Sequence, residues 1–125
     1  MRILIAIHDM GLLSALRMWI GEQAGFTLIG EASDMESLLD QAEETQPDLV
    51  LLDWELRGQP GSDLITALHA LDSQPKVVVL SVKLGAEETA MAAGADAFAA
   101  KGDPPKRLLL VLQRMRLERD AEAPK

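Results

Sequence analysis

The chain has 125 residues, enough to bury the core of one ordinary domain and too few for two independent ones. Aromatic residues make up only 3% and cysteine is absent, so we expect an aliphatic core without disulfides, thiolate metal sites or a cysteine nucleophile. The net charge of -8 argues against nucleic-acid binding, and no apolar run suits a membrane span or a signal sequence, so we expect a cytoplasmic protein with no membrane contact.

The chain begins with a short apolar strand over residues 3–7, followed by a helix pattern. Asp9 is the candidate N-cap of that helix, and Gly25 is expected to close it. The helix places its apolar side chains on one face: Leu12, Leu16, Trp19 and Ile20. A second strand is predicted over residues 26–32.

Residues 33–36, Ser-Asp-Met-Glu, have the Ser-x-x-Glu spacing of a capping box. They predict a helix that runs to about Thr45, with Pro47 beyond its end. An unbroken apolar strand follows over residues 48–53 and stops at Asp53, before a turn rich in glycine and proline.

The second half of the chain repeats the alternation as helix, strand, helix and strand over residues 62–70, 76–81, 86–93 and 97–100. Gly94 is expected to end the second of these helices. Asp103 is the candidate cap of a last helix, with Pro104 and Pro105 in its first turn, where a missing amide hydrogen costs little.

Five repetitions of strand then helix predict an α/β fold. The fold expected is a doubly wound, five-stranded parallel sheet with five helices, arranged in three layers with right-handed crossovers. In such sheets the carboxyl ends of neighbouring strands deliver side chains into one crevice, where ligands bind.

Three strands end in polar residues, which the fold should bring to this crevice: Asp53, Ser81 and Lys101. Taken singly, each has an ordinary structural interpretation as a loop acid, a strand terminus or a solvated charge. Together they suit transient phosphoryl chemistry. Asp53 would attack a phosphoryl group, Ser81 would donate a hydrogen bond to it, and Lys101 would neutralise its charge.

The sequence resembles a bacterial response-regulator receiver domain from residue 2 to about residue 115, without an insertion. The resemblance is carried by Asp-Leu-Val-Leu-Leu-Asp at 48–53, Val-Val-Val-Leu-Ser at 77–81 and Gly-Ala-Asp-Ala-Phe-Ala-Ala-Lys at 94–101. It implies a flavodoxin-like, CheY-like sheet with strand order 2-1-3-4-5, a receiver domain over residues 1–119 and a short polar tail over residues 120–125.

The resemblance also assigns roles. Asp53 is the implied phosphoacceptor, Ser81 the switch hydroxyl and Lys101 the partner of the phosphoryl charge. Phe98 lies three residues before the lysine, where the family often places a switch aromatic. An ordinary, partly buried core aromatic is the alternative interpretation of Phe98.

The end of the first strand departs from the family. Receivers usually have two adjacent acids here, which hold Mg²⁺ together with the phosphoacceptor, whereas this chain has Ile7 and His8. Mg²⁺ requires oxygen ligands in near-octahedral geometry. We therefore expect an impaired metal site in which Asp53 binds Mg²⁺ weakly, with help from His8 or Asp9, and no other cofactor.

The two residues that follow Ser81, Val82 and Lys83, also affect the predicted site. The β-branched Val82 stands where the family generally keeps a small residue, and it is expected to narrow access to Asp53. Lys83 either brings a second positive charge to the rim or is a solvated loop lysine. With no cysteine and only His8 and His69 as histidines, a zinc site is not expected.

The last helix has a core face and an outer face. Its predicted core residues are Leu108, Val111, Leu112 and Met115. Leu110 and Leu117 lie roughly opposite these. They are either a homodimer or partner surface, as in receivers that dimerise through this helix, or scattered surface leucines.

The leading hypothesis is a receiver in two-component or phosphorelay signalling, not an enzyme with its own substrate. A histidine kinase or phosphorelay protein would phosphorylate Asp53 and so change a surface near Phe98. These residues encode no output domain, so a separate output protein is expected. The alternative is a pseudo-receiver that binds partners without phosphorylation. A flavin-binding flavodoxin-like protein is disfavoured because residues 8–11 have one glycine and an acid, which repels phosphate.

Overall fold

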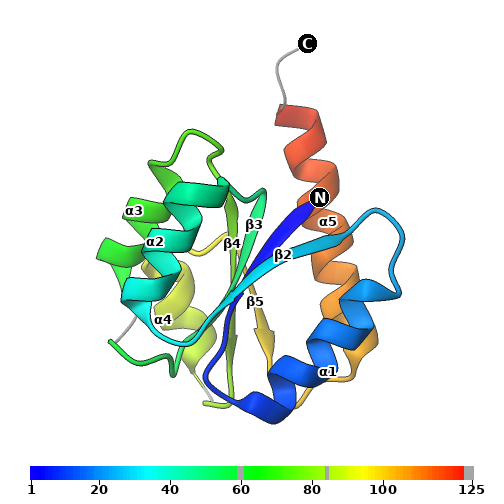
Figure 1. Ribbon diagram of the computed structural model, residues 1–125. Helices are drawn as coiled ribbons and strands as arrows, with labels where there is room; N and C mark the ends of the chain where they lie inside the picture. Colours follow the sequence, from blue (N-terminus) through cyan, green and yellow to red (C-terminus); the bar gives the residue numbers. More distant parts are fainter. Residues whose placement is uncertain (59–60, 84, 123–125) are drawn as a thin grey trace.

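The computed structural model describes residues 1–58, 61–83 and 85–122. Strands and helices alternate along the chain, as the sequence predicts (Figure 1). The strands are β1 (Arg2–Ala6), β2 (Thr27–Ala32), β3 (Leu49–Asp53), β4 (Lys76–Ser81) and β5 (Ala97–Ala100). The helices are α1 (Met10–Gly21), α2 (Met35–Thr45), α3 (Ser62–His69), α4 (Ala86–Ala92) and α5 (Pro105–Glu122).

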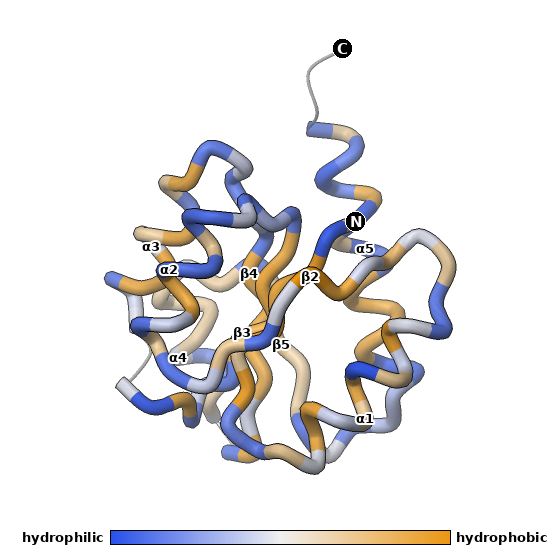
Figure 2. The backbone as a smooth tube through the Cα atoms, in the orientation of Figure 1, coloured by the Kyte–Doolittle hydropathy of each residue, from blue (hydrophilic) through white to orange (hydrophobic). Residues whose placement is uncertain are grey.

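The five strands form one parallel sheet in the order β2-β1-β3-β4-β5, which confirms the predicted topology. β3 lies at the centre, and all five of its residues are buried because β1 and β4 flank it and helices cover both faces. Its uninterrupted aliphatic sequence is what such a position requires. Figure 2 shows hydrophobic residues concentrated on the strands at the centre of the molecule.

Each face of the sheet has its own apolar core, which gives the three predicted layers (Figure 1). Side chains alternate between the faces along each strand. Ile3 and Ile5 of β1 pack with α1 and α5, whereas Leu4 and Ala6 pack with α2, α3 and α4. None of the helices in the described part of the chain is long and apolar enough to cross a membrane.

The N-cap predicted for α1 is confirmed, whereas the N-cap predicted for α2 is wrong. Asp9 caps α1 as predicted, because its Oδ1 accepts a hydrogen bond from the Leu12 amide at 3.1 Å. The capping-box prediction is wrong by one residue: the N-cap of α2 is Asp34, which accepts from the Ser37 amide at 2.8 Å. Asp34 is equally suited to capping and also forms a β-bridge with Arg57, which fixes it at this position.

Two boundaries differ further from the predictions. α1 ends at Gly21 and not near Gly25, which instead has a positive φ of 87° in the turn that leads to β2. α5 continues through residues 120–122, which were predicted to belong to the tail, while residues 123–125 lie outside the described part of the chain.

Contacts at the far end of α5 account for its extra length. The Arg119 guanidinium donates to the Gln74 carbonyl at 2.8 Å and lies 3.1 Å from Asp48. The Lys76 ammonium lies 2.8 Å from the Glu122 carboxylate. These contacts hold the last turns of α5 against the segments that enter β3 and β4.

Candidate functional site

Asp53 is the last residue of β3, and it is fully buried. Its Oδ1 accepts hydrogen bonds from the Glu55 amide at 2.8 Å and from the Lys101 ammonium at 2.7 Å. Its Oδ2 accepts from the His8 amide at 3.0 Å. A buried carboxylate is tolerated only when donors replace its lost hydration, and these donors supply that replacement.

Strand register brings the other two predicted residues to the same edge of the sheet. Asp53 pairs with Leu80 across β3 and β4, so Ser81 is the next residue along the neighbouring strand. Lys101 directly follows β5, and its amide donates to the Ser81 carbonyl at 2.9 Å. Asp53 and Ser81 are buried, and the Lys101 side chain is 12% exposed. The predicted convergence of carboxylate, hydroxyl and ammonium is therefore present.

Glu55 completes this site, and the sequence interpretation missed it. Its carboxylate accepts hydrogen bonds from the Ser81 hydroxyl at 2.8 Å and from the Val82 amide at 3.0 Å. The Lys101 ammonium lies 3.4 Å from the same carboxylate. The available signal was an acid two residues after Asp53.

The residues proposed to assist a metal ion are used otherwise. His8 gives Asp53 its backbone amide, Asp9 caps α1, and Ile7 is 99% buried with no side-chain oxygen. Within the described residues, no group of three or more His, Asp or Glu side chains is close enough to hold a metal ion.

His69 lies near the start of β4, whereas His8 follows the carboxyl end of β1, so the two histidines are at opposite ends of the parallel strands. Its Nε2 is 2.8 Å from Asp96, which also accepts a hydrogen bond from the Val77 amide at the start of β4. The two histidines therefore cannot share a metal ion. His69 instead connects the end of α3 to the loop before β5.

Residues around the site vary in burial. Val82 is 68% exposed, so most of its side chain faces solvent. Lys83 is also exposed, and its amide donates to the Ser81 hydroxyl oxygen at 3.1 Å. Phe98 is partly buried against the α2–α4 core and also lines a surface hollow next to Leu110 of α5. Both interpretations of Phe98 agree with this position.

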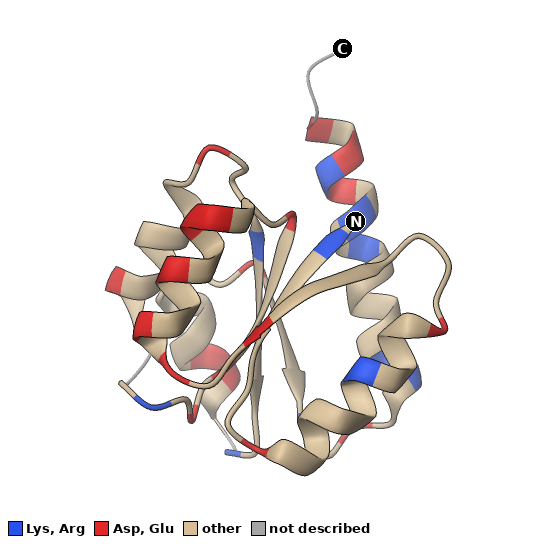
Figure 3. Cartoon of the chain, in the orientation of Figure 1, with Lys and Arg blue, Asp and Glu red and all other residues tan. Residues whose placement is uncertain are grey.

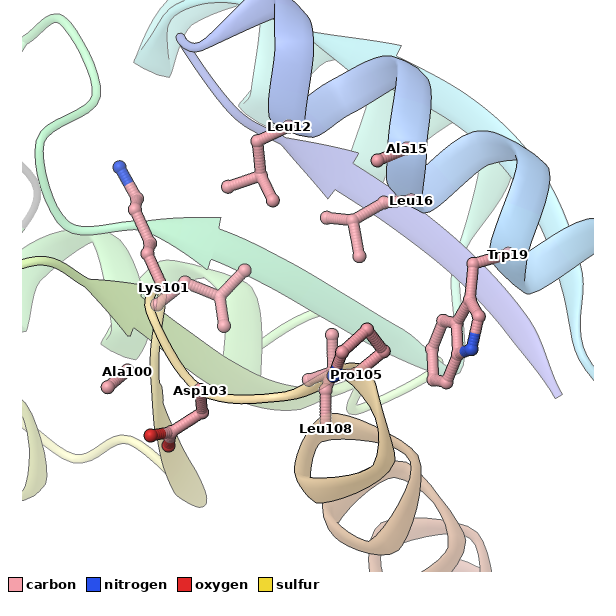
Figure 4. Close-up of a pocket in the computed structure, with 10 residues that line it drawn as sticks. Leu12, Ala15, Leu16, Trp19, Ala100, Lys101, Asp103, Pro105 and Leu108 are labelled. Carbon is pink, nitrogen blue, oxygen red and sulfur yellow. The ribbon is translucent and has the colours of Figure 1, made fainter.

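An apolar cavity of about 350 Å³ lies beside the site, between α1 and α5. Figure 4 shows its walls, which come mainly from Leu12, Leu16, Trp19, Pro105 and Leu108. The aliphatic stem of Lys101 borders the cavity, and its ammonium points away from Trp19. Lys101 thus separates an apolar hollow from the polar site around Asp53.

The strand order β2-β1-β3-β4-β5 is the one that the resemblance to receiver domains implies. Residues 3–113 match the response regulator receiver domain family. The chain therefore belongs to the family of response regulator receiver domains, which act in two-component systems.

Named relatives agree with this assignment. The chain is 34% identical over 112 residues to the nitrate/nitrite response regulator protein NarL of Escherichia coli (strain K12), covering 88% of this chain and 51% of that protein. It is 34% identical over 113 residues to the phosphate regulon transcriptional regulatory protein PhoB of Klebsiella pneumoniae, covering 86% and 48%. The chain thus spans about half the length of these relatives.

Solved structures show the same fold. The CheY-like response regulator receiver domain protein from Methanospirillum hungatei JF-1 matches over 98% of each chain, with a TM-score of 0.84 and 25% identity. The response regulatory domain of mrkE from Klebsiella pneumoniae matches over 98% of this chain and 100% of that chain, with a TM-score of 0.85 and 16% identity.

Proposed function

We propose that this receiver is a phosphorylation switch whose acceptor is Asp53. The observation that carries the proposal is the buried Asp53 carboxylate, with the Lys101 ammonium 2.7 Å from its Oδ1 and Ser81 on the adjacent strand. A histidine kinase or phosphorelay protein would supply the phosphoryl group. A carboxylate oxygen of Asp53 would attack phosphorus as the phosphorus–nitrogen bond to the donor imidazole breaks, and the imidazole would leave with the bonding electrons.

The added charge would alter the surroundings of Asp53. A phosphoryl group carries close to two negative charges and several acceptor oxygens, which Lys101 and the Ser81 hydroxyl, once released from Glu55, would bind. Movement of Ser81 would displace the neighbouring strand β5, which contains Phe98. We propose that the resulting surface change is recognised by a separate output protein, and that the domain has no enzymatic activity on a substrate of its own.

The test is incubation with acetyl phosphate and Mg²⁺, followed by intact mass measurement. We expect one phosphoryl adduct on the native chain and none on Asp53→Asn. Asp48→Asn is the matched control, because Asp48 immediately precedes the same strand and lies at its opposite end. An adduct that survives in Asp53→Asn, or no adduct on the native chain, would refute the proposal.

A pseudo-receiver that binds partners without phosphorylation is the second candidate. Ile7 and His8 in place of an acid pair favour it, and so does the engagement of Ser81 by Glu55. Under this alternative, partner binding would be equal for native protein and Asp53→Asn, with or without acetyl phosphate.

We further propose that Mg²⁺ binds here only weakly, because both Asp53 oxygens already accept hydrogen bonds and the Glu55 carboxylate is held by Ser81, Val82 and Lys101. His8→Asp adds an oxygen ligand beside Asp53. We expect this variant to bind Mg²⁺ at least tenfold more tightly, as measured by shifts of the Glu55 amide signal in NMR titrations. Equal affinity in the two proteins would show that another feature blocks the metal.

A further inference from the structure

Glu55 occupies the hydrogen-bond donors that would otherwise receive an anion at this site. Its Oε2 accepts from the Ser81 hydroxyl at 2.8 Å, and its Oε1 accepts from the Val82 amide at 3.0 Å. The Lys101 ammonium, 3.4 Å from Oε1, adds a positive charge. The Glu55 side chain is only 23% exposed, so it is held within the site and does not extend into solvent.

This occupation excludes other acceptors. A serine hydroxyl and a backbone amide each have a single hydrogen to donate, so Ser81 and Val82 cannot bind a second anion while they donate to Glu55. An incoming anion would also be repelled by the Glu55 carboxylate itself. The Lys101 ammonium donates a hydrogen bond to Asp53 and forms an ion pair with Glu55 at 3.4 Å, so its charge is already shared by two carboxylates.

We propose that Glu55 is an internal latch. Its carboxylate stands in for an external anion on Ser81, Val82 and Lys101 and holds residues 81–83 in their present position. Where the proposed phosphoacceptor function holds, the consequence is competition: the latch must open before a phosphoryl group on Asp53 reaches Ser81. Glu55 is thus a positioning residue that acts through the residues it binds.

The charge-removing substitution Glu55→Gln tests the latch, with Glu87→Gln as the control. Glu87 is an exposed acid in the first turn of α4, shortly after the same loop. In Glu55→Gln we expect hydrogen exchange of the Val82 amide to rise about tenfold, because a neutral amide oxygen is a weaker acceptor than the carboxylate that it replaces. In Glu87→Gln the exchange of this amide should equal that of the native protein.

A second measurement separates a latch from a merely structural contact. With acetyl phosphate as donor, we expect Glu55→Gln to be phosphorylated on the order of tenfold faster than the native chain, whereas loss of a simple support would slow the reaction. Glu87→Gln should react at the native rate. Unchanged Val82 exchange, or an adduct that forms equally fast or more slowly in Glu55→Gln, overturns the latch.

The two measurements also distinguish the latch from the phosphoacceptor function. Faster Val82 exchange in Glu55→Gln, with no adduct on either protein, supports the latch and refutes phosphorylation of Asp53. An adduct on Asp53 that forms equally fast in both proteins supports phosphorylation and overturns the latch.

Discussion

Asp53 keeps a carboxylate in the interior because hydrogen-bond donors reach it from separate segments of the chain. Lys101 follows β5, the His8 amide follows β1, and the Glu55 amide lies two residues downstream. Lys101 alone among these donors carries a full charge. Its loss would leave the buried Asp53 and the adjacent Glu55 as two carboxylates without their shared cation.

Lys101→Met is therefore expected to destabilise the fold. The isosteric stem keeps the packing against the apolar cavity, so the loss reports the charge, and we expect about 3 kcal/mol in the free energy of unfolding. Urea unfolding followed by circular dichroism measures it. Lys106→Met, at an exposed lysine in α5, is the control and should change stability by less than about 0.5 kcal/mol. Equal midpoints for Lys101→Met and native protein would contradict this account of Asp53.

Between elements, an ion pair joins α1 to β2. Arg17 Nε donates to the Glu31 carboxylate at 2.6 Å. This hydrogen bond lowers the pKa of Glu31 and raises the pKa of Arg17. Because the pKa of Glu31 is lower in the folded than in the unfolded chain, the pair stabilises the fold above the unfolded pKa, and that stability is lost as the pH falls through the folded pKa.

Glu31→Gln should reveal this pH dependence. We expect its melting temperature to lie below that of the native protein at neutral pH, and the difference to vanish in acid, well below the ordinary glutamate pKa of about 4.3. The difference should also shrink in high salt, because Arg17 is half exposed. Thermal melts across a pH series measure both effects, with Glu44→Gln, at an exposed acid of α2, as the control. A difference that is constant with pH would exclude the ion pair as its cause.

The elements themselves were largely readable from the sequence. β4 and β5 have the predicted bounds because an aliphatic run and an adjacent polar residue mark both ends of a buried strand. The sequence predicts Ser33 as the cap of α2, but Asp34, one residue later, has the same capping ability and a tertiary contact decides between them. Such contacts are not visible in local patterns.

Only part of the candidate site could be predicted, because the rest of it also depends on tertiary contacts. The positions of Asp53, Ser81 and Lys101 follow from strand ends, which local sequence marks. The role of Glu55 depends on the direction of its side chain after β3. The groups that donate hydrogen bonds to it belong to Ser81 and Val82, which lie 26 and 27 positions further along the chain. No spacing rule along the chain indicates that contact.

Across the whole molecule, charge is unevenly distributed (Figure 3). The exposed side of α2 carries mainly acids, whereas the basic residues of α5 give that helix bands of positive charge. On the outer surface of α5, Leu110 and Leu117 are 56% and 70% exposed. Leu110 also borders the hollow beside Phe98, which connects this surface to the strand that precedes Lys101.

We propose that these leucines form a homodimer surface. Leu110→Glu combined with Leu117→Glu should convert a dimer to a monomer in sedimentation velocity runs, because charges would be buried without partners at the interface. Met18→Glu changes an equally exposed apolar residue of α1 and should leave the sedimentation coefficient of the native protein unchanged. A monomeric native protein across the concentration range would show that the leucines are ordinary surface residues.

The complete burial of β3 between two hydrogen-bonded neighbours has a calorimetric consequence. A change at Asp53 can rearrange the rim but cannot expose the aliphatic interior, so modified and unmodified protein should have the same heat-capacity increment of unfolding, even if their midpoints differ. Under the proposed switch, the sheet would stay fixed, and a partner would recognise the displacement of a few side chains and loops relative to it.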